Sequence, residues 1–209
     1  LEPQNMDVRI SEKVSKLLHE QIALEANASN YYLSVGSWCN VNGHDGAASF
    51  FKNQAEEERQ HMLKIVQYLN DLRVHVVIPQ VDAPPQNMQS LEEIFKSALE
   101  NEKNVTKSID NIIETAQSEN DHRTDNFLEW FVNEQVEEED LFESILQKFD
   151  VIGRDKLALH EIDKILANQA QQPQEKGQPA GHLGEAVAAL RALATLPARA
   201  AYRPDGRSS

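Results

Sequence analysis

The chain has 209 residues, a formal net charge of −14 and a single cysteine, Cys39. This length can bury a substantial core. The acidic excess argues against nucleic acid or an anionic membrane as a partner, because both bind Lys and Arg. One cysteine excludes an intrachain disulfide and argues against a thiolate metal site. No stretch approaches the roughly 20 apolar residues that span a bilayer, and the N-terminal residues do not resemble a signal peptide, so we expect a cytoplasmic protein.

Apolar residues spaced three and four apart predict four long amphipathic helices. The first three lie at about residues 11–40, 47–70 and 90–120. A short turn begins at Asp121, and the fourth helix follows it and continues to about residue 149. A turn at residues 43–46 joins the first two helices. Three prolines between residues 74 and 89 exclude a helix there and indicate a long extended crossover. Ser90 and Glu93 have the spacing of a capping box, which opens the third helix. Two short turns and one long connection predict an antiparallel four-helix bundle with one crossover.

A shorter fifth helix is predicted at residues 155–168, after Gly153. The composition changes after Lys176, because the remaining residues contain no Lys and are rich in Ala. We therefore expect one all-α domain over residues 7–170. Residues 1–6 are expected to be a leader or added sequence, and residues 171–209 a disordered tail.

Each of the four long helices carries a glutamate near the middle of its apolar face: Glu25, Glu58, Glu102 and Glu138. No Lys or Arg lies on these four faces. An uncompensated buried carboxylate costs at least several kcal/mol. We therefore expect the compensating charge to come from a metal ion.

Glu58 and His61 form the sharpest local motif. Residues three apart share a helix face, so they can offer a carboxylate oxygen and an imidazole nitrogen to one ion. The alternative is an exposed helix pair, which the inward-facing apolar neighbours disfavour. Di-iron carboxylate bundles take a Glu from each of two helices and a Glu-x-x-His from each of the other two. Glu25 and Glu102 suit the first role.

The fourth helix departs from that scheme, because Leu141 stands three residues after Glu138 where a second histidine would be. Gln135, on the same face, can partly replace the missing ligand. One metal position should therefore be poorer in ligands and more exchangeable. This difference between the two metal positions favours a centre through which metal ions pass over one that holds a permanent metal cofactor.

The chain resembles the prokaryotic non-haem ferritins over roughly residues 7–170. The matching stretches are Glu25–Tyr32, Ala55–His61, Asn101–Lys103 and Phe127–Glu139. The resemblance implies a homo-oligomeric cage of 24 subunits with an iron centre and no haem. In such a cage Fe(II) is oxidised by dioxygen or peroxide and stored as a ferric mineral.

The resemblance also implies roles for particular residues. Glu25, Glu58 and His61 would form the first iron site, and Glu58 would bridge to a second site completed by Glu102 and Glu138. Tyr32 would lie beside the centre, although it could be only a core aromatic, and Gln135 would lie in its near shell. Three glutamates resemble a third, outer iron site of bacterial members, although solvated side chains are the simpler interpretation: Glu57, Glu134 and Glu137.

Two other functions are open from the sequence. A non-catalytic cage subunit would lack some of the five principal ligands, all of which are present. A di-iron peroxidase or oxygenase resembling rubrerythrin would have a second Glu-x-x-His and usually a CxxC module, and Leu141 and the lone Cys39 argue against it. Leu141 also argues against a bacterioferritin.

Overall fold

A computed structural model of the chain describes residues 9–171. This part contains five helices and no strand: α1 (Glu12–Val41), α2 (Asp45–Asp71), α3 (Leu91–Ser118), α4 (His122–Ile152) and α5 (Lys156–Gln171). The predicted all-α class and the five predicted helices are confirmed. The predicted leader and almost all of the predicted tail lie outside the described residues.

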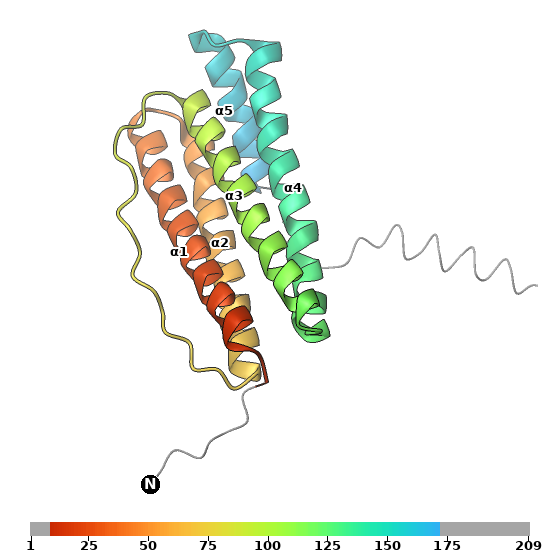
Figure 1. The fold of residues 1–209 in the computed structure, drawn as a ribbon. Coiled ribbons are helices and arrows are strands. Elements are labelled where there is room, and N and C mark those ends of the chain that lie inside the picture. The colour runs from red at the N-terminus through yellow and green to blue at the C-terminus, as the bar shows by residue number, and fades with distance from the viewer. Residues whose placement is uncertain (1–8, 172–209) are drawn as a thin grey trace, which may run out of the picture. The chain divides into compact units, whose positions relative to one another are not determined.

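The four long helices lie side by side, and the extended crossover between α2 and α3 runs along the outside of α1 (Figure 1). α1 packs against α2 and α3, and α3 packs against α4. α5 packs against α2 and α4 at one end of the bundle. This is the predicted arrangement of two antiparallel hairpins joined by one long connection.

Side-chain caps begin four of the five helices; at the start of α5, Asp155 accepts hydrogen bonds from Leu157 N–H at 2.8 Å and Ala158 N–H at 3.0 Å. Ser11 accepts a hydrogen bond from the Val14 N–H at 3.1 Å, and Ser90 accepts one from Glu93 N–H at 3.2 Å. Such caps satisfy backbone donors that a helix leaves free at its N-terminus. Asp121 caps α4 in the same way. α4 ends at Gly153, whose φ of 113° is a conformation that favours glycine.

The start of α2 differs from the prediction, because the helix begins at Asp45, inside the predicted turn. The cause is α5: the Asp163 carboxylate accepts hydrogen bonds from Gly46 N–H at 3.0 Å and Ala47 N–H at 2.8 Å. A Cβ atom on Gly46 would lie 1.9 Å from the carbonyl oxygen of Asp163. A glycine is therefore needed here for α5 to approach α2.

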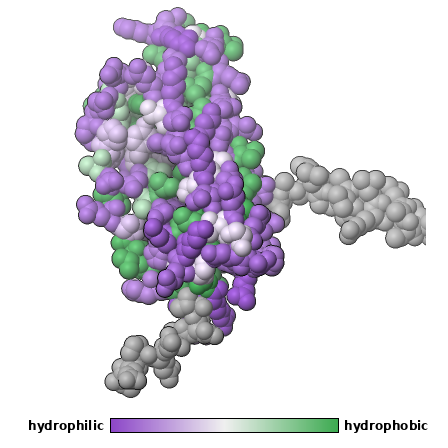
Figure 2. Space-filling view, viewed as in Figure 1, coloured by the Kyte–Doolittle hydropathy of each residue, from purple (hydrophilic) through white to green (hydrophobic). Residues whose placement is uncertain are grey.

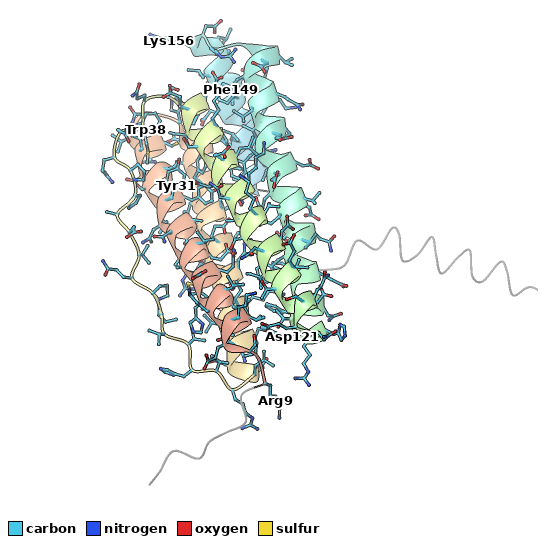
Figure 3. The ribbon with its side chains drawn as sticks, viewed as in Figure 1. Arg9, Tyr31, Trp38, Asp121, Phe149 and Lys156 are labelled. Atoms are coloured by element: carbon cyan, nitrogen blue, oxygen red, sulfur yellow. The ribbon has the colours of Figure 1, made fainter. Side chains whose placement is uncertain are left out.

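The interior has two apolar clusters with a polar belt between them. One cluster contains Phe51 and Phe142, and the other contains Ile65 and Leu128. Figure 3 shows the ends of the bundle through its labels: Trp38 and Phe149 lie towards one end, and Arg9 and Asp121 lie at the other. On each long helix, the glutamate of the apolar face lies in sequence between residues of the two clusters. The four glutamates therefore lie near the middle of the helices.

The face seen in Figure 2 is predominantly hydrophilic, with hydrophobic residues in small separate patches. None of the helices in residues 9–171 is long and apolar enough to cross a membrane.

Candidate metal centre

Each long helix contributes one buried glutamate to the middle of the bundle. Glu25 and Glu138 have no exposed surface, and Glu102 and Glu58 are 1% and 2% exposed. No Lys or Arg is buried anywhere in residues 9–171. Four carboxylates therefore share an interior that holds no permanently cationic side chain, which is costly unless protons or a metal neutralise them.

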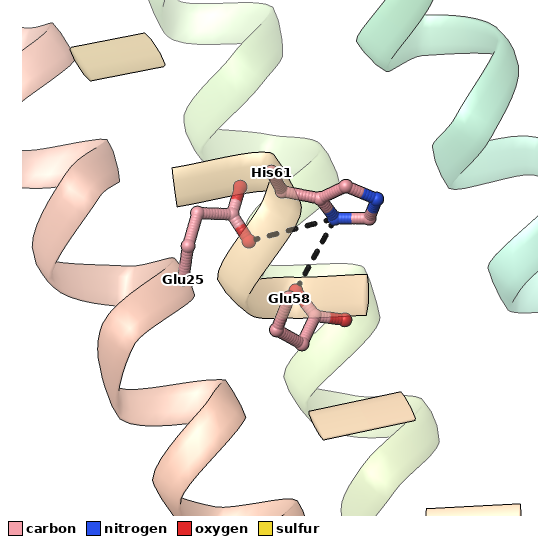
Figure 4. Close-up of side chains that lie close together, drawn as sticks. All are labelled: Glu25, Glu58 and His61. Atoms are coloured by element: carbon pink, nitrogen blue, oxygen red, sulfur yellow. Dashed lines mark ion pairs between the residues drawn. The ribbon is translucent and has the colours of Figure 1, made fainter. Parts of the chain in front are cut away.

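Three side chains meet closely enough to bind one ion (Figure 4). His61 Nδ1 lies 3.4 Å from Glu58 Oε2 and 3.9 Å from Glu25 Oε2. Among the described residues, these three form the one group whose ligand atoms all lie within 4.8 Å of one another. Ligands that are each about 2.1 Å from a shared cation lie roughly 3 to 4 Å apart. The spacing therefore fits a metal ion with little rearrangement.

Hydrogen bonding within the centre supports the same conclusion. Glu25 Oε2 and His61 Nδ1 are buried and have no hydrogen-bond partner among the described residues. Buried polar atoms without partners are rare in folded proteins, and each one needs an explanation. A cation bound between the two atoms would use the lone pair of each.

Burial shifts the ionisation of these carboxyl groups. Burial, together with the charge of Glu58, raises the pKa of Glu25 well above its usual value. Burial and the charge of Glu102 do the same to the pKa of Glu58. Burial also raises the pKa of Glu102 to about 7, although hydrogen bonds from Tyr32 and Gln135 oppose the rise. Without a cation the centre therefore holds protons near neutral pH, and a bound metal would displace them.

The side of the centre formed by Glu102 and Glu138 is different. Glu102 accepts hydrogen bonds from the Tyr32 hydroxyl and from Gln135 Nε2, the latter at 3.3 Å. Glu138 is fully buried, and its charge adds to burial in raising the pKa of both Glu58 and Tyr32. The residue three positions after Glu138 on α4 is Leu141, which packs against the apolar core.

Tyr32 is a core aromatic whose hydroxyl reaches one of the buried glutamates. Its ring is fully buried and stacks on Phe51 and Phe142, with centroids 5.7 Å and 5.9 Å away. Its hydroxyl donates to Glu102. Burial and the adjacent carboxylates raise the pKa of this phenol well above its usual value, so the group stays protonated and acts as a donor.

The three residues of the predicted outer site do not meet in a comparable group within residues 9–171. Glu134 is buried, and its Oε1 lies 3.9 Å from His61 Nε2. Glu57 is half-buried and accepts a hydrogen bond from Gln54, whereas Glu137 is exposed. The third site remains a prediction.

Two buried glutamines at the centre were not predicted from the sequence. Gln21 is fully buried and donates from Nε2 to Glu25 Oε1 at 2.7 Å, and Gln54 is 1% exposed and donates to Glu57. Their spacing of four and three residues from an acid on the same helix is the signal that could have found them. Trp130 contacts the His61 ring edge-on, with centroids 5.4 Å apart.

Comparison with known proteins agrees with this geometry. Residues 15–152 match the family model of the ferritin-like domain. A bacterial non-haem ferritin of Campylobacter jejuni is 42% identical over 161 residues, which is 77% of this chain and 96% of that protein. A probable bacterial non-haem ferritin-like protein of Haemophilus influenzae is also 42% identical, over 76% of this chain and 96% of its own length.

Solved structures give the same result. The structure of an open-pore ferritin from the archaeon Archaeoglobus fulgidus is 37% identical to the chain and superposes with a TM-score of 0.74. The match covers 76% of this chain and 96% of that one. The family resemblance inferred from the sequence motifs is confirmed.

Proposed function

Since the chain belongs to the ferritin family, we propose that it stores iron and oxidises Fe(II) at the buried centre between its four long helices. The observation that carries this proposal is the meeting of Glu25, Glu58 and His61 in an interior without Lys or Arg. Fe(II) is the substrate of this centre. No haem ligand is needed for the chemistry.

Charge balance favours two ferrous ions. The carboxylates of Glu25, Glu58, Glu102 and Glu138 carry four negative charges when ionised, and two Fe(II) ions carry four positive charges. A pair of ferrous ions would thus neutralise a group that is otherwise neutralised by protons. In this proposal Glu25, Glu58 and His61 hold the first ion, and Glu102 and Glu138 hold the second. Glu58 contacts both.

The ligand set also favours oxidation. Carboxylate oxygens are hard donors and stabilise Fe(III) relative to Fe(II), which lowers the cost of removing an electron. Two Fe(II) ions supply two electrons, which with two protons reduce dioxygen to hydrogen peroxide. With peroxide as the oxidant instead, two electrons and two protons reduce one molecule of peroxide to two molecules of water. Tyr32 and Gln135, both hydrogen-bonded to Glu102, would fix the position of that carboxylate.

The oxidised pair should leave the centre. Two Fe(III) ions carry six positive charges, which the four glutamates cannot balance without added hydroxide or oxide. The half without an imidazole would release its ion more readily. Glu134, whose Oε1 lies 3.9 Å from His61 Nε2, would with Glu57 and Glu137 form the outer position through which ferric ions pass towards a mineral.

The proposal includes a closed homo-oligomeric cage of 24 subunits in the cytoplasm, as the family resemblance implies. Aerobic addition of Fe(II) to the full-length protein should give rapid oxidation, and the iron should co-elute with the protein as a ferric mineral. Native mass measurement should give a single large assembly of this 23.6-kDa chain.

Each of these two measurements tests one part of the proposal. A stable monomer or dimer would remove the storage function and leave the metal centre standing. Fe(II) oxidation no faster than in buffer alone would remove the ferroxidase function.

A further inference from the structure

A glutamine supports the carboxylate that faces His61. Gln21 lies one helical turn before Glu25 on α1 and has no exposed surface. Its Nε2 donates to Glu25 Oε1 at 2.7 Å. The other carboxylate oxygen, Glu25 Oε2, is the one that lies 3.9 Å from His61 Nδ1.

This contact divides the two oxygens of Glu25 between two tasks. A glutamate side chain has three rotatable bonds, and apolar surroundings alone do not fix the rotation of its carboxylate. A single strong donor on Oε1 fixes that rotation and leaves Oε2 directed at the group formed with Glu58 and His61. An amide must present its NH₂ to a carboxylate, because its oxygen has no proton to donate.

We propose that Gln21 is a positioning residue for the metal centre, which holds Glu25 with Oε2 turned towards the ion. The proposal rests on the proposed function of this centre. Gln21 acts through Glu25 and is not itself a ligand.

The surroundings of Gln21 argue against a role in stability alone. It lies among apolar residues of α1, between Leu18 and Ile22, which belong to one of the two core clusters. Its Oε1 is buried and has no hydrogen-bond partner among the described residues. A leucine or methionine at this position would remove that unsatisfied oxygen. The amide is therefore better explained by its contact with Glu25 than by the packing of the core.

The experiment compares two apolar variants, Gln21→Leu and Gln21→Met, with the wild type in the full-length assembled protein. Anaerobic titration with Co²⁺, which does not undergo oxidation here, measures binding by calorimetry and by visible absorption. We expect Co²⁺ affinity at the first site to fall about 10- to 100-fold, the usual effect of removing a residue that orients a ligand. Thermal stability of the metal-free variants should be equal to or higher than that of the wild type.

Gln67→Leu is the matched control, because Gln67 makes the same contact on the surface of α2, where its Nε2 donates to Asp71 at 2.8 Å. This control should bind Co²⁺ as the wild type does. Wild-type affinity in both Gln21 variants would overturn the proposal, as would an equal loss in Gln67→Leu or a large loss of stability in both Gln21 variants. A wild type that binds no Co²⁺ would instead overturn the proposed function of the centre.

Discussion

Glu58→Ala should lower the initial rate of Fe(II) oxidation by at least about 100-fold. Glu58 is buried on α2, 3.4 Å from His61 Nδ1, and burial together with the charges of Glu102 and Glu138 raises its pKa. Its loss therefore removes a ligand from both proposed iron positions. Mutation of a residue that only orients a ligand lowers metal affinity or activity about 10- to 100-fold, so loss of a ligand shared by two ions should lower the rate more. Stopped-flow absorbance of the ferric product measures the rate.

Glu56→Ala is the control for that variant, because Glu56 lies on the same helix and is exposed. It removes the same charge from α2 without touching the buried group, so its oxidation rate should match the wild type. His61→Ala should slow oxidation as well, since it removes the one imidazole of the group. Wild-type rates in both Glu58→Ala and His61→Ala would show that iron is oxidised elsewhere on the molecule.

The metal-free protein should lose stability as the pH rises from about 5 to 8. The pKa of Glu102 is raised from 4.5 to about 7, and the pKa values of Glu25 and Glu58 are raised well above 4.5. A folded state that holds protons which the unfolded chain releases becomes less stable as the pH rises through that interval. At roughly 1.4 kcal/mol per pKa unit, Glu102 alone contributes on the order of 3 kcal/mol. Thermal unfolding at pH 5 and pH 8 in the presence of a chelator measures the loss.

Two further measurements separate this effect from other titrations. Glu58→Gln replaces a buried acid by a neutral group of the same shape, so the metal-free variant should be more stable than the wild type at pH 8. Saturating Zn²⁺ should stabilise the wild type at pH 8 and stabilise Glu58→Gln much less. Glu92, whose pKa is lowered to about 2 by Arg154 and Lys96, changes charge below this pH range and does not contribute. Metal-free stability that increases steadily from pH 5 to 8 would contradict the assignment.

The sequence predicted the parts of the structure that depend on one helix at a time. The glutamates at positions 25, 58, 102 and 138 interrupt apolar faces, and an apolar face can be recognised from residue spacing alone. Their burial followed once the four faces formed a common core. Ser90 capped α3 as predicted because a capping residue acts within four residues of its own position.

Other features depend on contacts between distant segments, which spacing does not reveal. The early start of α2 depends on Asp163, more than 100 residues away in α5. The bond from Tyr32 to Glu102 depends on the packing of α1 against α3. Gln21 is a different case, because its contact with Glu25 lies within one helix. An uncharged polar residue on an apolar face gives no strong sequence signal, so spacing alone did not predict the contact.

The most direct test of an unequal pair of iron sites is an anaerobic calorimetric titration of the assembled wild type with Fe(II). We expect two Fe(II)-binding steps per subunit, of unequal affinity. His61→Ala should remove the tighter step, and Glu102→Ala should remove the weaker step and leave the tighter one in place. Two equal steps in the wild type, or loss of the tighter step in Glu102→Ala alone, would contradict an unequal pair of iron sites built on Glu25, Glu58 and His61.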